Sequence, residues 1–453
     1  MVTDRLYASV VTDEAAESII KRMRISYFLA SGAVLALFCV AFGSARADPS
    51  AAVDDYREAR GALVKAYQQG DFSAMRSAAD AALQARPGYP GALFNRALAE
   101  VLDDDAAASL QTLRKLLSMH VDFGVAAIDD FAPLMKLPGW HDYAAAARRL
   151  HDPVGVAEVV VLHEESDFIP EGIARDAEGR LYLGSIRKGK IVRIDEDAET
   201  LSTPVNGHWS VFGMRFDEQG GLWFASADIA QFEGHEETGN ATGLFCLDRD
   251  TRQVSLKALL PASEHPQLLG DLVIGGDGEL YATDSLSGAV YAYRRTTNSF
   301  EAVAGQGAFG SPQGLVMDAS GRYLYIADYI GGLFRITLAT GTVEKVTVTA
   351  NATDYGIDGL YRYGDELIAI QNGVRPHRVV AFKLGDNGRS ISRARILAAN
   401  LPEFDEPTLG LVDGDSFYFV ANSHWNRFDA DHNVPEGLTG PIVLKLTLSG
   451  APE

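Results

Sequence analysis

Cysteine and positive charge are both scarce in this chain. Only Cys39 and Cys246 occur among 453 residues, so a scaffold held by several disulfides is excluded. Lys and Arg number 40 against 61 Asp and Glu, which gives a formal net charge of −21. Because so acidic a chain repels nucleic-acid phosphates and anionic membrane surfaces, we expect neither as a partner.

Apolar residues and glycine, by contrast, are plentiful. Hydrophobic residues make up 47% of the chain and charged residues 22%, which is enough to build a core and excludes disorder throughout. The 44 glycines indicate many turns. On length alone, the chain is expected to form about three domains, or two with one large.

Residues 1–47 are predicted to be a secretory signal peptide. Basic residues within 21–24 precede an apolar run at 27–43, and an Ala-x-Ala site follows at 45–47. Met23 is a candidate for the true start, because the residues before it would make an oddly long and acidic leader. Export to the periplasm or out of the cell is the consequence of this prediction.

An uncleaved membrane anchor is the alternative, and the apolar run of 17 residues is at the short limit for spanning a bilayer. Cleavage would remove five basic and four acidic residues, which takes the net charge from −21 to −22. It would also leave Cys246 as the only cysteine. The exported protein would then be held together by packing alone, with no membrane contact after cleavage.

Residues 48–152 are predicted to form a helical module. Apolar residues recur there at helical spacing, with breaks at 70–71 and 87–90. The segment 70–99 resembles the tetratricopeptide helix–turn–helix pattern. Since only one or two repeats are visible and a stable stack needs about three or more, we expect the module to pack on the C-terminal part of the chain. A groove for a partner protein and a packing spacer are the two interpretations.

Residues 153–453 repeat one pattern six times: an apolar strand, a turn with glycine, and a hydrophobic-aromatic strand. The leading positions are 41, 58, 43, 45 and 50 residues apart, a spacing typical of four-stranded propeller blades. The predicted fold is therefore mainly β, a six-bladed β-propeller with an N-terminal α-helical domain. The leading residues are Glu171, Phe212, Gly270, Gln313, Asp358 and Thr408.

These repeats resemble a known family. The segments EGIARDAEGRLYLGS (171–185), QGLVMDASGRYLYIAD (313–328) and DGLYRYGDELIAI (358–370) are similar to the gluconolactonase/senescence-marker-protein/luciferin-regenerating family. That family belongs with the six-bladed paraoxonase-like and strictosidine-synthase-like propellers. The resemblance covers about residues 155–450, and it implies a divalent cation, usually calcium, in the central channel.

The family holds its cation with one Glu, two Asn and one Asp. The resemblance implies that Glu171 and Asp358 are the Glu and the Asp, and that Asp358 is also the catalytic general base. The two Asn positions differ, because Gly270 and Gln313 stand there. Gln313 still offers an amide oxygen and Asp271 could replace the missing ligand, so we predict these four side chains as metal ligands. Loss of the metal is the alternative.

A second set of polar residues ends the second strand of several blades. They could bind hydroxyl groups of a small-molecule substrate, or they could simply form turns. The loop 424–427 could likewise contact a ligand, or it could simply be a packed loop. The predicted substrate-binding residues are Asp284, Asp328, Asn372 and Asn422.

Two functions are consistent with these observations. The first is an exported, metal-dependent hydrolase of the gluconolactonase type that acts on a lactone or an ester. The second is a non-catalytic protein that binds a small ligand, or a partner protein through the helical module.

Overall fold

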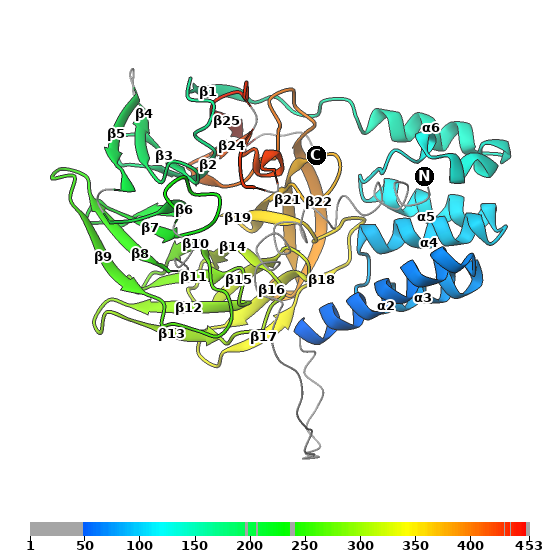
Figure 1. Ribbon diagram of the computed structural model, residues 1–453, viewed down its shortest axis with the longest axis horizontal. Helices are drawn as coiled ribbons and strands as arrows, with labels where there is room; N and C mark the ends of the chain where they lie inside the picture. The colour runs from blue at the N-terminus through cyan, green and yellow to red at the C-terminus, as the bar shows by residue number, and fades with distance from the viewer. Residues whose placement is uncertain are drawn as a thin grey trace, which may run out of the picture.

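The computed structural model shows a layer of helices beside a ring of six β-sheets (Figure 1). The predicted signal peptide at 1–47 lies outside the residues that it describes. Within the described part of the chain, every helix is too short or too polar to cross a membrane. The described residues are 49–194, 198–204, 207–235, 241–429, 431–434 and 436–449.

The helices begin and end where the sequence predicts breaks. Gly70 adopts a φ of 70°, which ends the first helix, and the Asp71 carboxylate accepts the Ala74 N–H to cap the next one. Pro90 opens a helix, where its missing N–H costs nothing. The helical module consists of α2 (Pro49–Gln69), α3 (Phe72–Ala85), α4 (Pro90–Leu102), α5 (Ala106–Ser118), η2 (Val125–Ala127), η3 (Asp129–Lys136) and α6 (Trp140–Arg149).

Each sheet is one propeller blade of antiparallel strands, and the predicted six-bladed propeller is confirmed. The fifth blade has an extra edge strand that pairs in parallel, β18 (Thr347–Val348). From the innermost strand outward, the blades are β2 (Pro170–Arg175), β3 (Leu181–Ser185), β4 (Ile191–Ile194) and β5 (Ala198–Ser202); β6 (Ser210–Phe216), β7 (Gly221–Ala227), β8 (Thr242–Asp248) and β9 (Val254–Leu259); β10 (Leu269–Ile274), β11 (Leu280–Asp284), β12 (Ala289–Arg294) and β13 (Ser299–Ala304); β14 (Pro312–Met317), β15 (Tyr323–Asp328), β16 (Gly332–Thr337) and β17 (Thr342–Lys345); β19 (Ile357–Tyr363), β20 (Glu366–Gln371), β21 (Arg378–Gly385) and β22 (Ser390–Ala399); and β23 (Gly410–Asp413), β24 (Ser416–Val420), β25 (Ile442–Thr447) and β1 (Glu158–Leu162).

The ring closes by combining the two ends of the propeller sequence in one blade. β1 comes before the first blade but pairs with β25 as the outer strand of the sixth. The inner strands contact one another in succession around the channel, and β23 contacts β2 to complete the ring. Closure therefore gives each inner strand a neighbouring blade on both sides.

The helical module packs against the fourth and fifth blades, beside β21 and β22 (Figure 1). The Tyr355 hydroxyl donates to the Pro87 carbonyl, and the rings of Tyr355 and Tyr89 meet edge to face at 5.1 Å. The guanidinium of Arg86 lies 3.7 Å from the Tyr89 ring centre and 5.0 Å from that of Tyr355. The module therefore packs on the propeller, as its few repeats predict.

Candidate active site in the central channel

A β-bulge at the same place in five inner strands points side chains into the channel. Between two successive paired residues, each of these inner strands has one residue more than its partner strand. The regular alternation of side chains is interrupted at that point. The leading residue lies in this bulge, and in four blades a glycine follows it. The register shifts fall between Pro170 and Ile173, Val211 and Met214, Leu269 and Leu272, Pro312 and Leu315, and Ile357 and Leu360.

The glycines in the bulges let neighbouring inner strands approach closely. A methyl group on Gly314 would lie 2.5 Å from the Leu360 backbone nitrogen and 2.6 Å from the Asp358 carbonyl oxygen. The third blade reverses this order, with Gly270 in the leading position and Asp271 second. Asp271 therefore packs toward the neighbouring strand, while Gly270 leaves open space at the channel.

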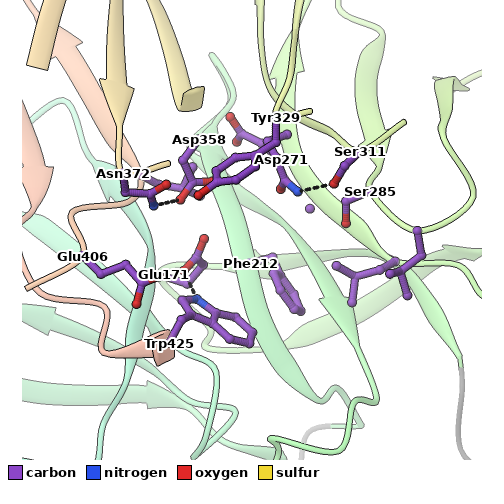
Figure 2. A pocket seen from close by; sticks show the side chains of 15 residues that line it. Glu171, Phe212, Asp271, Ser285, Ser311, Tyr329, Asp358, Asn372, Glu406 and Trp425 are labelled. Carbon is purple, nitrogen blue, oxygen red and sulfur yellow. Dashed lines mark hydrogen bonds between the residues drawn. The ribbon is translucent and has the colours of Figure 1, made fainter. Parts of the chain in front are cut away.

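The bulge residues surround one pocket at the channel mouth (Figure 2). Its volume of about 70 Å³ for the centres of water-sized molecules accommodates several waters or part of a small ligand. The lining combines carboxyl groups, hydroxyls, amides and aromatic rings. The lining residues are Glu171, Phe212, Leu268, Gly270, Asp271, Ser285, Leu286, Ser311, Gln313, Tyr329, Asp358, Asn372, Glu406, Leu409 and Trp425.

Glu171 and Asp358 meet through one hydroxyl group. The Thr408 Oγ lies 2.8 Å from Glu171 Oε1 and 2.9 Å from Asp358 Oδ2. The Trp425 indole N–H donates to the other oxygen of Glu171 at 2.6 Å, and the Asn372 amide donates to Asp358 Oδ2 at 2.6 Å (Figure 2). The chain itself therefore supplies hydrogen-bond donors to both oxygens of Glu171 and to one oxygen of Asp358.

A hydroxyl group has a single proton, so both contacts of Thr408 are full hydrogen bonds when one carboxyl group of the pair carries a proton. Burial raises the pKa of Glu171 well above its usual value, and the neighbouring Asp358 charge adds to the shift. Burial also raises the pKa of Asp358, to about 6, although hydrogen bonds from Thr408 and Asn372 oppose the shift. Both carboxyl groups therefore bind a proton more readily than they would in water, and the Thr408 hydroxyl, which contacts both, is placed to pass a proton between them.

A third carboxyl group, Glu406, lies on the same side of the pocket. Burial raises its pKa to about 7, and the charges of Asp358 and Asp405 contribute, while the Asn426 backbone N–H donates to its Oε2 at 2.7 Å. The side-chain oxygen of Asn372 has no hydrogen-bond partner among the described residues. Three acids of raised pKa, Glu171, Asp358 and Glu406, therefore lie together on this side of the pocket.

The residues predicted as metal ligands all line the pocket, but their hydrogen bonds and ion pairs differ. Arg215 forms an ion pair with Asp271 at 3.3 Å, and the Leu272 N–H donates to the same carboxylate at 2.8 Å. The Gln313 amide nitrogen donates to Ser311 Oγ at 3.1 Å. Asp271 is thus neutralised by a cation of the chain and is turned toward it.

These residues do not fit the four-ligand calcium site that the resemblance implies. Gly270 supplies no oxygen, Asp271 is paired with Arg215, and both oxygens of Glu171 are already engaged in hydrogen bonds with Thr408 and Trp425. In the described ranges, no three or more His, Cys, Asp or Glu side chains are arranged to hold a metal ion. Instead, these carboxyl groups are bound by hydrogen-bond donors of the chain itself.

Of the predicted substrate-binding residues, the structure brings Asn372 to the pocket and places the other three in turns. Asp284 accepts the backbone N–H groups of Leu268 and Ser287, at 2.8 and 3.1 Å. Asp328 accepts four backbone N–H groups of its own loops. Asn422 accepts the Ile442 N–H at 2.7 Å and donates to the Gly440 carbonyl. These three side chains therefore stabilise turns, which was the alternative to binding substrate.

Sequence reasoning assigned no role to Thr408, which joins the two carboxyl groups, or to the lining residues Glu406 and Tyr329. Thr408 occupies the sixth leading position, so its place in the repeat was the available signal. Glu406 lies two residues before it and has a φ of 66°, which no repeat pattern indicates. Trp425, from the loop 424–427, contacts the pocket as one of the two interpretations allowed.

Comparison with known sequences gives a short match. The family described as strictosidine synthase-like, N-terminal, matches residues 157–194, which run from just before β1 to the end of β4. No curated protein matches the chain in sequence.

Solved propellers are similar to the chain at low identity. Regucalcin, a calcium-binding protein from Agrobacterium tumefaciens, is 16% identical with a TM-score of 0.48, and the match covers 65% of this chain and 97% of that one. The PQQ-bound aldose sugar dehydrogenase from Streptomyces coelicolor is 13% identical, with a TM-score of 0.44 and coverage of 65% and 99%. Virginiamycin B lyase from Staphylococcus aureus is 15% identical, with a TM-score of 0.40 and the same coverage. Likeness at this level does not specify a reaction or a ligand for this chain.

Proposed function

We propose that the protein is an exported hydrolase that cleaves a small lactone or ester in the channel pocket. The observation that carries this proposal is the pair of carboxyl groups, Glu171 and Asp358, joined through the Thr408 hydroxyl. Burial raises the pKa of both acids, so the pair can hold one proton near neutral pH, with one group placed to donate a proton and the other to accept one.

In this mechanism Asp358 is the general base. It removes a proton from water as the water oxygen bonds to the carbonyl carbon of the substrate. Protonated Glu171 gives its proton to the oxygen that leaves when the carbon–oxygen bond of the lactone or ester breaks. The proton on Asp358 then returns to Glu171 through Thr408, which contacts both groups, and the site is restored.

The neighbouring residues support this arrangement. The Asn372 amide, which donates to Asp358 Oδ2 at 2.6 Å, would hold the carboxylate in place as the base. The aromatic rings of Phe212 and Trp425, stacked with centroids 6.5 Å apart, provide an apolar wall for the body of the substrate. Activity is expected to rise with pH through about 6, because Asp358 must be ionised to act.

The test is hydrolysis of a panel of lactones and esters, measured as release of acid at constant pH. Asp358→Asn is expected to lower turnover by a factor of roughly 10²–10⁴, since it removes the base. Asp250→Asn, the same change at a side chain that is 89% exposed, is the matched control and should leave turnover unchanged. No hydrolysis across the panel, or full activity in Asp358→Asn, would refute the proposal.

A second candidate function is the binding of a small organic cation without turnover. Among the described pocket-lining residues none is Lys, Arg or His, whereas Asp358 and, above about pH 7, Glu406 carry negative charge and Trp425 provides an aromatic face. Calorimetric binding of amines or quaternary ammonium ions, with no product formed, would favour this function. A partner protein captured only when the helical module is present would extend it.

A further inference from the structure

The segment Gln371–Arg378 connects the pocket directly to the helical module. At one end, the Asn372 amide donates to Asp358 Oδ2 at 2.6 Å and to the Pro407 carbonyl at 3.0 Å. Two residues later, Val374 is 3% exposed and packs within the hydrophobic core of the helical module. The Arg375 carbonyl then accepts the Asp122 N–H at 3.1 Å. A loop of the fifth blade is thus built into the helical core.

Arg378 fixes the far end of this segment. Its side chain is buried, and Nη1 donates to the carbonyls of Met119 and His120 at 3.0 and 2.8 Å, just beyond the last turn of α5. Carbonyl groups at a helix C-terminus lack partners within the helix and carry partial negative charge, so they suit a guanidinium. Burial lowers the pKa of Arg378 to about 10, so the group stays charged at neutral pH.

The same guanidinium holds the residue that precedes Asn372. Arg378 Nε donates to Gln371 Oε1 at 2.7 Å, and Gln371 is fully buried. The amide nitrogen of Gln371 in turn donates to the carbonyls of Thr353 and Tyr355, at 3.0 and 2.9 Å. A series of hydrogen bonds therefore runs from the end of α5 through Arg378 to Gln371, and Gln371 is joined by its peptide bond to Asn372, which contacts Asp358.

A second pocket wall contacts the helical module independently. Tyr329 lines the pocket, and the next residue, Ile330, is buried against Val53 of α2. This second pocket segment is therefore also anchored to the helical module.

We propose that the helical module is a positioning domain for the pocket, and that Arg378 is its main positioning residue, acting through Gln371 to hold Asn372 against Asp358. The module would then serve the pocket from within the same chain, by fixing the Asn372 wall of the fifth blade. Only the measurement of turnover depends on the proposed hydrolase function.

The test is hydrogen–deuterium exchange of Arg378→Met against Arg389→Met, a control that makes the same change on an exposed arginine of the fifth blade. We expect exchange across residues 371–374 to become roughly tenfold faster in Arg378→Met only, as a local opening. Arg378→Lys should restore part of the protection. Unchanged exchange there, or an increase spread evenly over all six blades, would overturn the proposal.

Two further measurements keep the inference testable. If Arg378→Met does not fold, Val374→Ala replaces it, with the same local increase expected and the same outcomes against it. Once a substrate is known, Arg378→Met should lower kcat roughly tenfold while KM changes by less than about twofold, because it misplaces the partner of the base. Absence of any hydrolysis would refute the hydrolase alone, since the exchange readout needs no substrate.

Discussion

At the scale of single residues, the pocket is dominated by acids held partly protonated. Glu406 is the clearest case, because burial raises its pKa from 4.5 to about 7. The folded state then binds a proton more tightly than the unfolded state, so stability must fall as pH rises from about 4.5 to 7. For Glu406 alone this amounts to about 3 kcal/mol of the free energy of unfolding.

We therefore expect Glu406→Gln to flatten this decline, since a neutral amide has no charge to bury. Urea unfolding at a series of pH values between 4 and 8 measures it. Glu264→Gln, the same change at an exposed residue, should keep the full decline. A slope that is identical in wild type and Glu406→Gln would show that Glu406 does not titrate in this range.

Gly270 gives a second prediction at this scale, on calcium. A methyl group built on Gly270 would lie 3.8 Å from Gln313 Oε1 and 3.9 Å from Ser285 Oγ, so the site has room for a side chain. We expect calcium to leave the melting temperature of the wild type unchanged and to raise that of Gly270→Asn, which supplies the missing amide oxygen. Thermal unfolding with calcium or with a chelator measures this.

Gly276→Asn is the matched control, because its backbone has open space and lies in a turn outside the pocket. A calcium-dependent rise in the wild type would instead support the cation site that the family resemblance implies. No rise in either protein would mean that one added oxygen does not complete the site.

At the scale of elements, the repeat made much of the site predictable. The spacing of the leading residues predicted six blades, and equivalent positions such as Glu171 and Asp358 do meet at one pocket. The bulge explains why, since it breaks the pleat at the same place in each inner strand. Residues at the same place in successive repeats therefore point their side chains in the same direction, toward the channel.

The parts of the site that come from loops were not predictable in the same way. Glu406 reaches the pocket from a loop, and Trp425 from the short 3-10 helix η6 (Trp425–Arg427), and the paths of both segments depend on packing. Strand-ending residues such as Asp284 and Asp328 look like ligand-binding groups in sequence. In the structure, however, their carboxylates already accept hydrogen bonds from backbone N–H groups. A pattern shows which residues are polar, but only the fold shows which polar groups are already satisfied.

At the scale of the whole molecule, the helical module and the propeller share one structural unit around the pocket. The fifth blade contributes Val374 to the helical core, and the sixth blade contributes Thr408, Glu406 and Trp425 to the site. The sixth blade is also the one that joins both ends of the propeller, through the pairing of β1 with β25. The integrity of the pocket therefore depends on closure of the ring.

Leu444 in β25 tests this dependence. It is fully buried, lies opposite Val159 of β1 and packs in the core between the fifth and sixth blades. Leu444→Ala is expected to lower the free energy of unfolding by about 2–5 kcal/mol, because it removes buried methyl groups and leaves a cavity. Since closure holds Thr408 in place, ligand binding or turnover at the pocket should weaken as well.

Lys445→Ala is the control, because the next side chain points to the opposite face and is 32% exposed, with a surface ion pair to Glu158 and an ammonium group 5.8 Å from the centre of the Tyr418 ring. It should change stability by less than about 0.5 kcal/mol. Denaturant unfolding of both variants, alongside binding at the pocket, distinguishes the two cases. If Leu444→Ala loses stability but the pocket keeps its full affinity, then the inner strands hold the site together without help from the outer closure.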